Sequence, residues 1–490
     1  MKLMIFGIDA LTPKLVFENL ELFPNIKKLC ENGMYGDYDA YAYGYGSSDN
    51  WISLYTGLTP KQHGVIGNTY KDTGRPARRE DYEGEKPFWN LLNTEGIKVG
   101  MWKGLNTSPP KKINGYMISG EPNFELDWKN DPLANIKPVF CNEDKELKKF
   151  ITGDIDRPPM PKTPEDFGVT WEALLKDNSI AKMVLKKDYF HEGVEYFEKE
   201  LTFYGENIIN MQKNNPVDVI FFYTSIYDFI AHFQQHDTSK EELLTAIEIV
   251  DNFIGMILSE LVAENVILLS DHGIEALADN FHNTPINIQK EAFGWSDKSI
   301  WLEDSQIVTK ARNLAFLSGI HSLKGTFIIS GDKIQRGKIE NMRTVDFYPT
   351  ILELFDIKVP ENREGFVLDI FKNKVIINKD KLLNQEKIKP KNIAIIQDIE
   401  VSEFNRIINE VFLSNRFCNI TIVGEEKYKN IFNANLRVNK FRPLENMRID
   451  FRELSSYDSI YISYRNNKTK QFECLEIYNK IWEKINEKKF

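Results

Sequence analysis

The sequence predicts an α/β protein with a mostly parallel sheet between helices, an inserted cap and a smaller C-terminal α/β domain. Short apolar runs alternate with helical patterns along the chain, an order typical of a largely parallel sheet. A chain of 490 residues is too long for one ordinary hydrophobic core, so we expect two or three domains. The apolar fraction of 42% and the charged fraction of 27% are those of a globular protein.

Six apolar runs are predicted to be strands of the core sheet. They are Leu3–Ile8, Lys98–Trp102, Tyr116–Ser119, Val217–Tyr223, Val266–Leu269 and Thr326–Ile329. The clearest helix is predicted at Lys240–Ala263, because its apolar residues recur every three or four positions and form one buried stripe.

The periodicity loosens after the first strands, and we expect a cap at about residues 69–213 inserted into a core of residues 1–372. Residues 169–213 within it look helical. A Lys- and Asn-rich linker is predicted at residues 373–391. A second β/α alternation predicts a small α/β domain of unknown role at residues 392–490, ending in a helix at residues 470–488.

The bulk properties exclude several classes of partner. The net charge of -10 argues against binding to nucleic acid or anionic membranes, which needs clustered Lys and Arg. No apolar stretch approaches the roughly 20 residues that span a bilayer. The first nine residues lack the features of a signal peptide, so we expect a cytoplasmic protein. The four cysteines show no CxxC pairing and are expected to be reduced thiols.

Carboxylate and imidazole side chains recur just beyond the ends of predicted strands. Asp9 directly follows the first strand, Asp228 lies beyond the fourth, and Asp271 and His272 follow the fifth. Ligands of open α/β sheets bind at the carboxyl ends of the strands, so these placements indicate a site. His232 lies four residues after Asp228 and would share one face of a helical turn with it.

Together with His321 and the hydroxyl of Ser47, these groups could hold two divalent cations beside an alcohol, which suits phosphoryl transfer. Each signal also has a structural interpretation. The spacing of Asp228 and His232 is common by chance, and Asp271 could cap a helix beside a hydrogen-bonded histidine. An isolated histidine such as His321 is more often structural than catalytic.

Longer motifs join these residues. Residues 44–65 include Gly46-Ser47-Ser48, Thr56-Gly57 and His63-Gly64. Residues 106–110, 114–120, 319–331 and 346–352 supply further motifs, among them a His-x-x-x-Gly strand that begins at His321. In combination they resemble the alkaline phosphatase superfamily, closest to its type I phosphodiesterase / nucleotide pyrophosphatase branch and to predicted phosphohydrolases or phosphomutases. The resemblance covers about residues 1–372.

The resemblance implies two metal sites and a serine nucleophile. The ligands would be Asp9, Ser47, Asp271 and His272 at the first site, and Asp228, His232 and His321 at the second. A Thr or Ser in those proteins lies nine residues before the Thr of Thr-Gly, and counting back from Thr56 gives Ser47. Ser47 would form a phospho-serine intermediate, its pKa lowered by the first cation. Asn50 would donate a hydrogen bond to a phosphate oxygen.

The chain departs from that pattern in three respects. Asp49 stands before Asn50, where relatives more often carry proline or another apolar residue. Ser48 adjoins Ser47, so the register of the nucleophile could slip by one residue. No Cys-x-Pro-x-Arg signature occurs, which argues against sulfate esters as substrates.

We therefore predict a two-metal phosphohydrolase that cleaves phosphodiester or pyrophosphate bonds through a phospho-serine intermediate. Its substrate would be a small phosphate-containing molecule such as a nucleotide or sugar nucleotide. The alternatives are a phosphomonoesterase, a phosphomutase similar to the cofactor-independent phosphoglycerate mutases, and a non-catalytic binding protein that kept the fold. Imidazole and carboxylate ligands favour Zn²⁺, and Mn²⁺ is also compatible with them. The oligomeric state is left open.

Overall fold

The computed structural model consists of two compact units, Met1–Ala276 with Phe316–Asn378 and Leu277–Ala315 with Lys379–Phe490. The residues that the structure describes are 1–40, 47–66, 69–70, 77–120, 178–234, 240–276, 319–322, 324–339, 342–372, 391–397, 418–424, 438–443, 459–465 and 472–476.

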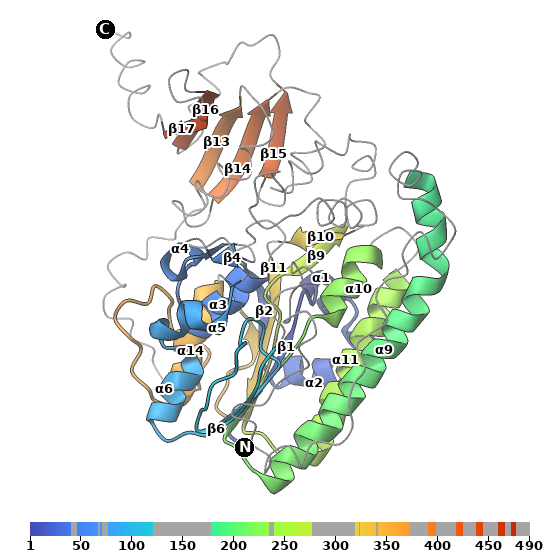
Figure 1. The fold of residues 1–490 in the computed structure, drawn as a ribbon, viewed down its shortest axis with the longest axis vertical. Helices are drawn as coiled ribbons and strands as arrows, with labels where there is room; N and C mark the ends of the chain where they lie inside the picture. Colours follow the sequence, from blue (N-terminus) through green and yellow to red (C-terminus); the bar gives the residue numbers. More distant parts are fainter. Residues whose placement is uncertain are drawn as a thin grey trace. The chain divides into compact units, whose positions relative to one another are not determined.

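The first unit is built on the sheet that contains β1, β2, β6 and β11 in Figure 1. It has eight strands in the order β12-β2-β11-β8-β1-β7-β5-β6. In that order the strands are Gly337–Lys338, Gly33–Asp39, Lys324–Gly331, Asn265–Leu269, Leu3–Ile8, Val219–Thr224, Val99–Trp102 and Gly115–Ile118. The five strands from β8 to β6 are parallel, whereas β11 runs antiparallel to both β8 and β2. The predicted mostly parallel sheet is confirmed.

All six predicted core strands are present, and no strand end differs from its prediction by more than two residues. Strand β2 was not predicted, because its sequence, GMYGDYD, mixes glycines and aspartates with tyrosines and does not form an apolar run. Pairing with β11 on one side and β12 on the other makes this segment a strand.

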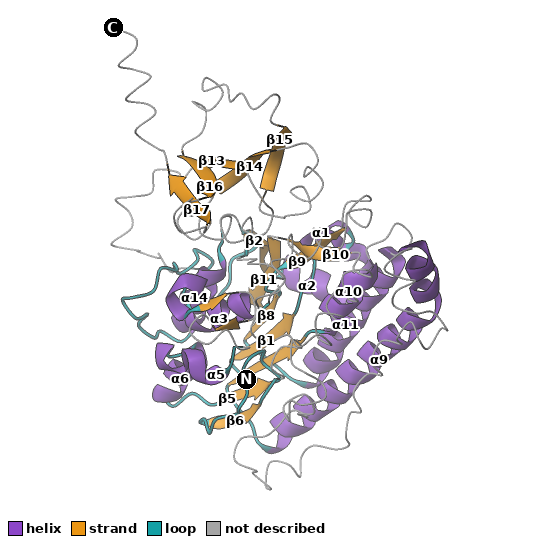
Figure 2. Cartoon of the chain, turned by 45° about the horizontal axis from the view of Figure 1, so that its top comes forward, coloured by secondary structure: helices purple, strands orange, loops and turns teal. Residues whose placement is uncertain are grey.

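Helices cover both faces of the sheet (Figure 2). On one face lie α2 (Pro24–Glu31), α9 (Asn178–Asn214) and α11 (Lys240–Glu260), and on the other lie α3 (Ser48–Thr56), α6 (Phe88–Thr94) and α14 (Phe347–Leu354). Alternate residues of β1 enter the two cores. Met4 and Phe6 face the first group of helices and Leu3 and Ile5 the second. Burial on both faces explains why β1 has a continuous apolar sequence.

Short elements complete the first unit. They are α1 (Pro13–Glu18), α4 (Pro60–His63), α5 (Arg79–Tyr82), α10 (Ile226–Gln234), the 3-10 helices Leu20–Leu22, Glu83–Glu85 and Thr344–Asp346, the pair β3 (Val65–Ile66) and β4 (Thr69–Tyr70), and the pair β9 (Gly273–Ala276) and β10 (Gly319–Ser322). Among the helices in the described ranges, none combines the length and apolar character needed to cross a membrane.

The predicted cap at about residues 69–213 is too wide. Strands β5 and β6 fall inside that range, yet they pair with β7 and form one edge of the main sheet. The C-terminal half of α9 also belongs to the core, since Phe197, Tyr204 and Ile208 are buried in the same cluster as residues of α11. Their apolar side chains fill the space beside the sheet, as those of any core helix do. Residues 121–177 of the predicted cap lie outside the described residues.

The second unit contains a five-stranded sheet with the order β15-β14-β13-β16-β17. The strands in chain order are Lys391–Gln397, Cys418–Gly424, Val438–Pro443, Ser459–Arg465 and Phe472–Glu476. All are parallel except β17, which pairs antiparallel with β16. The helix predicted at residues 470–488 is therefore wrong at β17, where pairing with β16 overrides the helical pattern. The rest of that predicted helix lies outside the described residues.

Gly57 ends α3 in the left-handed conformation, with φ of 69°. A Cβ atom there would lie 2.7 Å from the ring of Tyr348, whereas one on Gly96, at φ of 77°, would meet nothing within 4 Å. We expect Gly96→Ala to cost about 1 kcal/mol, the usual penalty for a left-handed residue that has a side chain. Gly57→Ala should cost about 1–3 kcal/mol more, because Tyr348 must move.

Chemical denaturation of the two variants, followed by tryptophan fluorescence, measures this difference. Equal losses of stability would show that the close packing of α3 against α14 at Gly57 has no energetic weight.

Candidate active site

Three parallel strands bring the predicted acidic residues to one edge of the sheet. Strand β1 pairs with β7 on one side and with β8 on the other, so the carboxyl ends of all three strands are neighbours. Asp9 follows β1, and Asp271 and His272 follow β8. Asp228 lies on α10, which begins just after β7. The backbone N–H of Asp9 donates to the carbonyl of Thr224 at 2.9 Å and so extends the pairing into the site.

Ser47 lies at the N-cap position of α3 and faces this edge. Its Oγ donates to Oδ1 of Asp9 at 3.2 Å and lies 3.2 Å from Nε2 of His272. The side chain is buried, with 6% of its surface exposed. The N-terminus of a helix favours negatively charged groups, because its first N–H groups point outward and the helix dipole is positive there. The hydroxyl therefore lies where an anionic substrate group would be stabilised.

The carboxylate of Asp271 is held by its neighbours. Its Oδ1 accepts the backbone N–H of Ala10 at 3.2 Å, and its Oδ2 lies 3.0 Å from Nε2 of His272. Strand β9, and not a helix, follows at Gly273. The alternative prediction that Asp271 caps a helix is therefore wrong.

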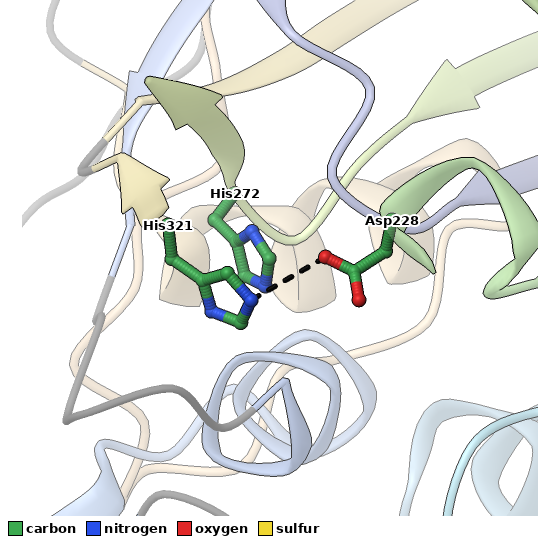
Figure 3. Close-up of side chains that lie close together, drawn as sticks. All are labelled: Asp228, His272 and His321. Carbon is green, nitrogen blue, oxygen red and sulfur yellow. Dashed lines mark ion pairs between the residues drawn. The ribbon is translucent and has the colours of Figure 1, made fainter. Parts of the chain in front are cut away.

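His321 reaches the site through the short β9–β10 pair. In that antiparallel pair His321 lies opposite Ile274, two residues beyond His272. The two imidazole rings stack with centroids 3.7 Å apart and an interplanar angle of 23°. Nε2 of His321 lies 3.3 Å from Oδ1 of Asp228, and Figure 3 shows these side chains converging.

The described residues form two groups that could hold metal ions. One is Asp9, Asp271 and His272, and the other is Asp228, His272 and His321. Within each group the candidate ligand atoms lie within 4.8 Å of one another. The resemblance implied that His272 belongs to the first site alone, whereas the structure brings it into both groups. His232 lies one turn after Asp228 on α10, and its side chain is outside the described residues.

The tautomer of His272 suits a metal ligand. Its Nδ1 lies 3.1 Å from the carbonyl oxygen of Gly273, an acceptor that requires a proton on Nδ1. In the neutral ring Nε2 is then the nitrogen with a free lone pair, and it points at Asp9, Asp271 and Ser47. A backbone carbonyl that fixes the ring in this way is a common support for histidine ligands.

The site carries an excess of buried negative charge. Burial, followed by the charges of Asp271 and Asp228, raises the pKa of Asp9 well above its usual value of 3.8. Burial by itself would lower the pKa of His272, but the carboxylates of Asp271, Asp9 and Asp228 outweigh it and raise the pKa to about 10. Divalent cations would neutralise these carboxylates, so the donor atoms and the charge both fit a metal site.

Two residues that bind Asp9 were not predicted from the sequence. Oδ2 of Asp9 accepts the indole N–H of Trp51 at 3.1 Å and the hydroxyl of Tyr223 at 2.6 Å. Trp51 lies four residues after Ser47 on α3, and Tyr223 is near the end of β7. Both belong to apolar stretches and are typical of a hydrophobic core, so the only signal was their closeness in sequence to predicted site residues.

Asn50 lies in the first turn of α3 and is fully buried. The hydroxyl of Thr344 lies 3.4 Å from Oδ1 of Asn50, as a donor to it. Asn50 lies three residues after Ser47, which is the N-cap of the same helix.

Part of this chain is similar in sequence to known phosphodiesterases and pyrophosphatases. Venom phosphodiesterase 2 from Crotalus adamanteus is 28% identical over 124 residues, which is 23% of this chain and 15% of that protein. Ectonucleotide pyrophosphatase/phosphodiesterase family member 3 from Bos taurus is 28% identical over 127 residues, or 24% of this chain and 14% of that protein. The alignments thus span about one seventh of each relative's length.

Among solved structures, human ectonucleotide pyrophosphatase / phosphodiesterase 5 aligns with 75% of this chain and 100% of its own, at 13% identity and a TM-score of 0.45. The model of the type I phosphodiesterase / nucleotide pyrophosphatase family matches residues 3–315, which is more than half of the 490 residues. That range contains Asp9, Ser47, Asp228, Asp271 and His272. The chain belongs to the type I phosphodiesterase / nucleotide pyrophosphatase family.

Proposed function

We propose that this protein is a metal-dependent hydrolase that cleaves phosphodiester or pyrophosphate bonds in small phosphate-containing molecules such as nucleotides or sugar nucleotides. The observation that carries the proposal is the position of Ser47. Its Oγ lies 3.2 Å from both Asp9 and His272, at the start of α3 and within a set of buried carboxylates and imidazoles. An alcohol held among metal-binding side chains is the arrangement that nucleophilic attack on phosphorus requires.

We propose two divalent ions, with Zn²⁺ as the first choice and Mn²⁺ as the second. Asp9, Ser47, Asp271 and His272 would hold one ion, and Asp228, His321 and His232 the other. Mixed imidazole and carboxylate ligands suit Zn²⁺. When bound, such ions neutralise charge on the phosphoryl oxygens and lower the pKa of a coordinated hydroxyl.

The side chains of this protein would then share the reaction. The hydroxyl of Ser47 gives up its proton to solvent and its Oγ forms a bond to phosphorus, while the ester or anhydride oxygen leaves with the bonding electron pair and takes up a proton from solvent as its own pKa requires. Water next attacks the resulting phospho-serine, which releases the phosphorylated product and restores the serine hydroxyl. Asn50 would donate an amide hydrogen to a phosphoryl oxygen. The N-terminus of α3, in whose first turn Asn50 lies, would add its favourable dipole.

The nucleophile is tested by Ser47→Ala, with Ser48→Ala as the matched control. The metal-reconstituted protein should hydrolyse bis-p-nitrophenyl phosphate faster than p-nitrophenyl phosphate. We expect Ser47→Ala to lower kcat by a thousandfold or more, roughly the loss seen when other hydrolases lose their nucleophile. Ser48→Ala should retain activity, because Oγ of Ser47 is the hydroxyl that contacts Asp9 and His272.

The outcomes separate the competing functions. No turnover of either ester with either metal would favour a non-catalytic binding protein. A strong preference for the monoester would replace the proposal with a phosphatase or mutase. Activity that is lost in Ser48→Ala and kept in Ser47→Ala would show that the register of the nucleophile is shifted by one residue.

Metal dependence is tested by exhaustive chelation and stepwise reconstitution. We expect the chelated protein to be inactive, Zn²⁺ to restore the highest rate, and Mn²⁺ to restore less. Metal analysis of the reconstituted protein should find two ions per chain, since the described ligands and His232 supply two sites. Full activity in the chelated protein would contradict the proposal.

The charge excess predicts a conflict between stability and metal binding at Asp9. In the chelated protein near pH 7.5, Asp9→Asn should raise the thermal midpoint, because the pKa of Asp9 is raised by burial and by Asp271 and Asp228. The same variant should lose most of the stabilisation that Zn²⁺ gives to the wild type.

Asp346→Asn provides a contrast of opposite sign. This buried carboxylate accepts hydrogen bonds from Nη2 of Arg343 at 2.7 Å and from Nε at 3.1 Å, so its charge is compensated. Removing that charge should lower the thermal midpoint and leave the response to Zn²⁺ intact. Differential scanning calorimetry with and without Zn²⁺ measures both variants. A lower midpoint for chelated Asp9→Asn would contradict the assigned charge excess.

A further inference from the structure

The two carboxylate oxygens of Asp9 have separate partners. Oδ1 faces the reacting side of the site, 3.2 Å from Oγ of Ser47 and 3.6 Å from Nε2 of His272. Oδ2 faces the core and accepts hydrogen bonds from Trp51 Nε1 at 3.1 Å and Tyr223 Oη at 2.6 Å. Two neutral donors therefore bind Oδ2, and Oδ1 is directed toward Oγ of Ser47.

The surrounding fold is built to place these two donors. Trp51 and Tyr223 pack edge to face, with ring centroids 5.0 Å apart and an interplanar angle of 85°. Gly7 pairs with Tyr223 in the register of β1 and β7, and a Cβ atom on Gly7 would lie 2.8 Å from the ring of Trp51. The missing side chain at Gly7 thus leaves the space that the indole occupies. Trp51 is fully buried and Tyr223 is 4% exposed, so water does not compete freely for Oδ2.

We propose that Trp51 and Tyr223 are positioning residues that fix Asp9 as a metal ligand through one oxygen and so bias the first site toward small ions such as Zn²⁺. The inference rests on the proposed metal-dependent function. Two donors on Oδ2 restrict rotation of the carboxyl group and engage the lone pairs of that oxygen, which leaves Oδ1 for the ion. Donors that orient a ligand in this way commonly change metal affinity by 10–100-fold.

The choice of ion follows from the number of oxygens that Asp9 offers. Zn²⁺ takes few ligands in a compact tetrahedral arrangement, so one carboxylate oxygen is sufficient. Ca²⁺ takes six to eight oxygen ligands and readily accepts both oxygens of a carboxylate. A carboxyl group that is free to rotate would offer both oxygens, so loss of the two donors should disfavour Zn²⁺ more than Ca²⁺.

The test compares Zn²⁺ and Ca²⁺ binding to chelated full-length protein by titration calorimetry. The variants are Trp51→Phe, Tyr223→Phe and the double substitution, each of which keeps an aromatic ring in place. Tyr55→Phe is the control. Its ring packs near Trp51 in the same cluster, with centroids 6.1 Å apart, and its hydroxyl makes no hydrogen bond to Asp9.

We expect each single substitution to weaken Zn²⁺ binding about tenfold. The double substitution should weaken it by more than the product of the two single effects, because either donor alone still restrains the carboxyl group. The ratio of the Ca²⁺ to the Zn²⁺ dissociation constant should fall in every variant that lacks a donor. Tyr55→Phe should bind both ions as the wild type does.

Three results would overturn the inference. If the wild type neither binds Zn²⁺ nor hydrolyses the esters, the proposed function fails and the inference falls with it. If the wild type does both and the variants bind Zn²⁺ equally well, only the positioning role fails. Equal losses of affinity for Zn²⁺ and Ca²⁺ would show that the two residues support the structure of the site without selecting the ion. Near-ultraviolet circular dichroism of the chelated variants checks folding, and Trp51→Phe alone suffices if Tyr223→Phe does not fold.

Discussion

The parallel pairing of β1 with both β7 and β8 is the constraint on which the candidate site depends. Because the three strands run in the same direction, the residues that follow them meet at one edge, although Asp9 is more than 200 positions from Asp228 and Asp271 in sequence. A shift of β1 by one residue against its neighbours would turn Asp9 toward the opposite face of the sheet. Burial of β1 on both faces opposes such a shift, since every residue of the strand has a packed environment to lose.

The same burial lowers the stability of the folded protein when no ions are bound, because the carboxylates of the site are then buried without enough compensating charge. Asp9 and Asp271 are almost fully buried beside His272. Burial first, and then the charges of Asp271 and Asp228, raise the pKa of Asp9, whereas nearby carboxylates raise that of His272. Trp51 and Tyr223 reduce the cost at Asp9 by donating hydrogen bonds without adding charge. Neutral donors also preserve the net negative charge that attracts cations, which a lysine or arginine at either position would cancel.

The parallel core and Asp9, Asp271 and His272 could be predicted because each depends on local sequence. An apolar run followed by an acidic residue identifies a buried strand and the position just beyond its carboxyl end. The stacking of His321 on His272 could not be predicted, because it depends on an antiparallel pairing between segments about 45 residues apart. The roles of Trp51 and Tyr223 were hidden for another reason. Large aromatic residues in apolar stretches fit an ordinary core, and only coordinates show where an indole N–H or a phenol points.

The participation of His272 in both groups of candidate ligands limits how two ions could be held, if two bind as proposed. Nε2 is the one nitrogen of this ring that is available to a metal, because Nδ1 is engaged with the carbonyl of Gly273. A single nitrogen serves one ion at a time, and Nε2 lies 3.0 Å from Asp271 and 3.6 Å from Asp9, which favours the first site. Asp228 and His321 then need a third ligand. His232 is one turn along α10 from Asp228, where helical geometry places both residues on the same face. A role for His232 as that ligand stays a prediction of the family resemblance, and its four-residue spacing from Asp228 on α10 is compatible with it.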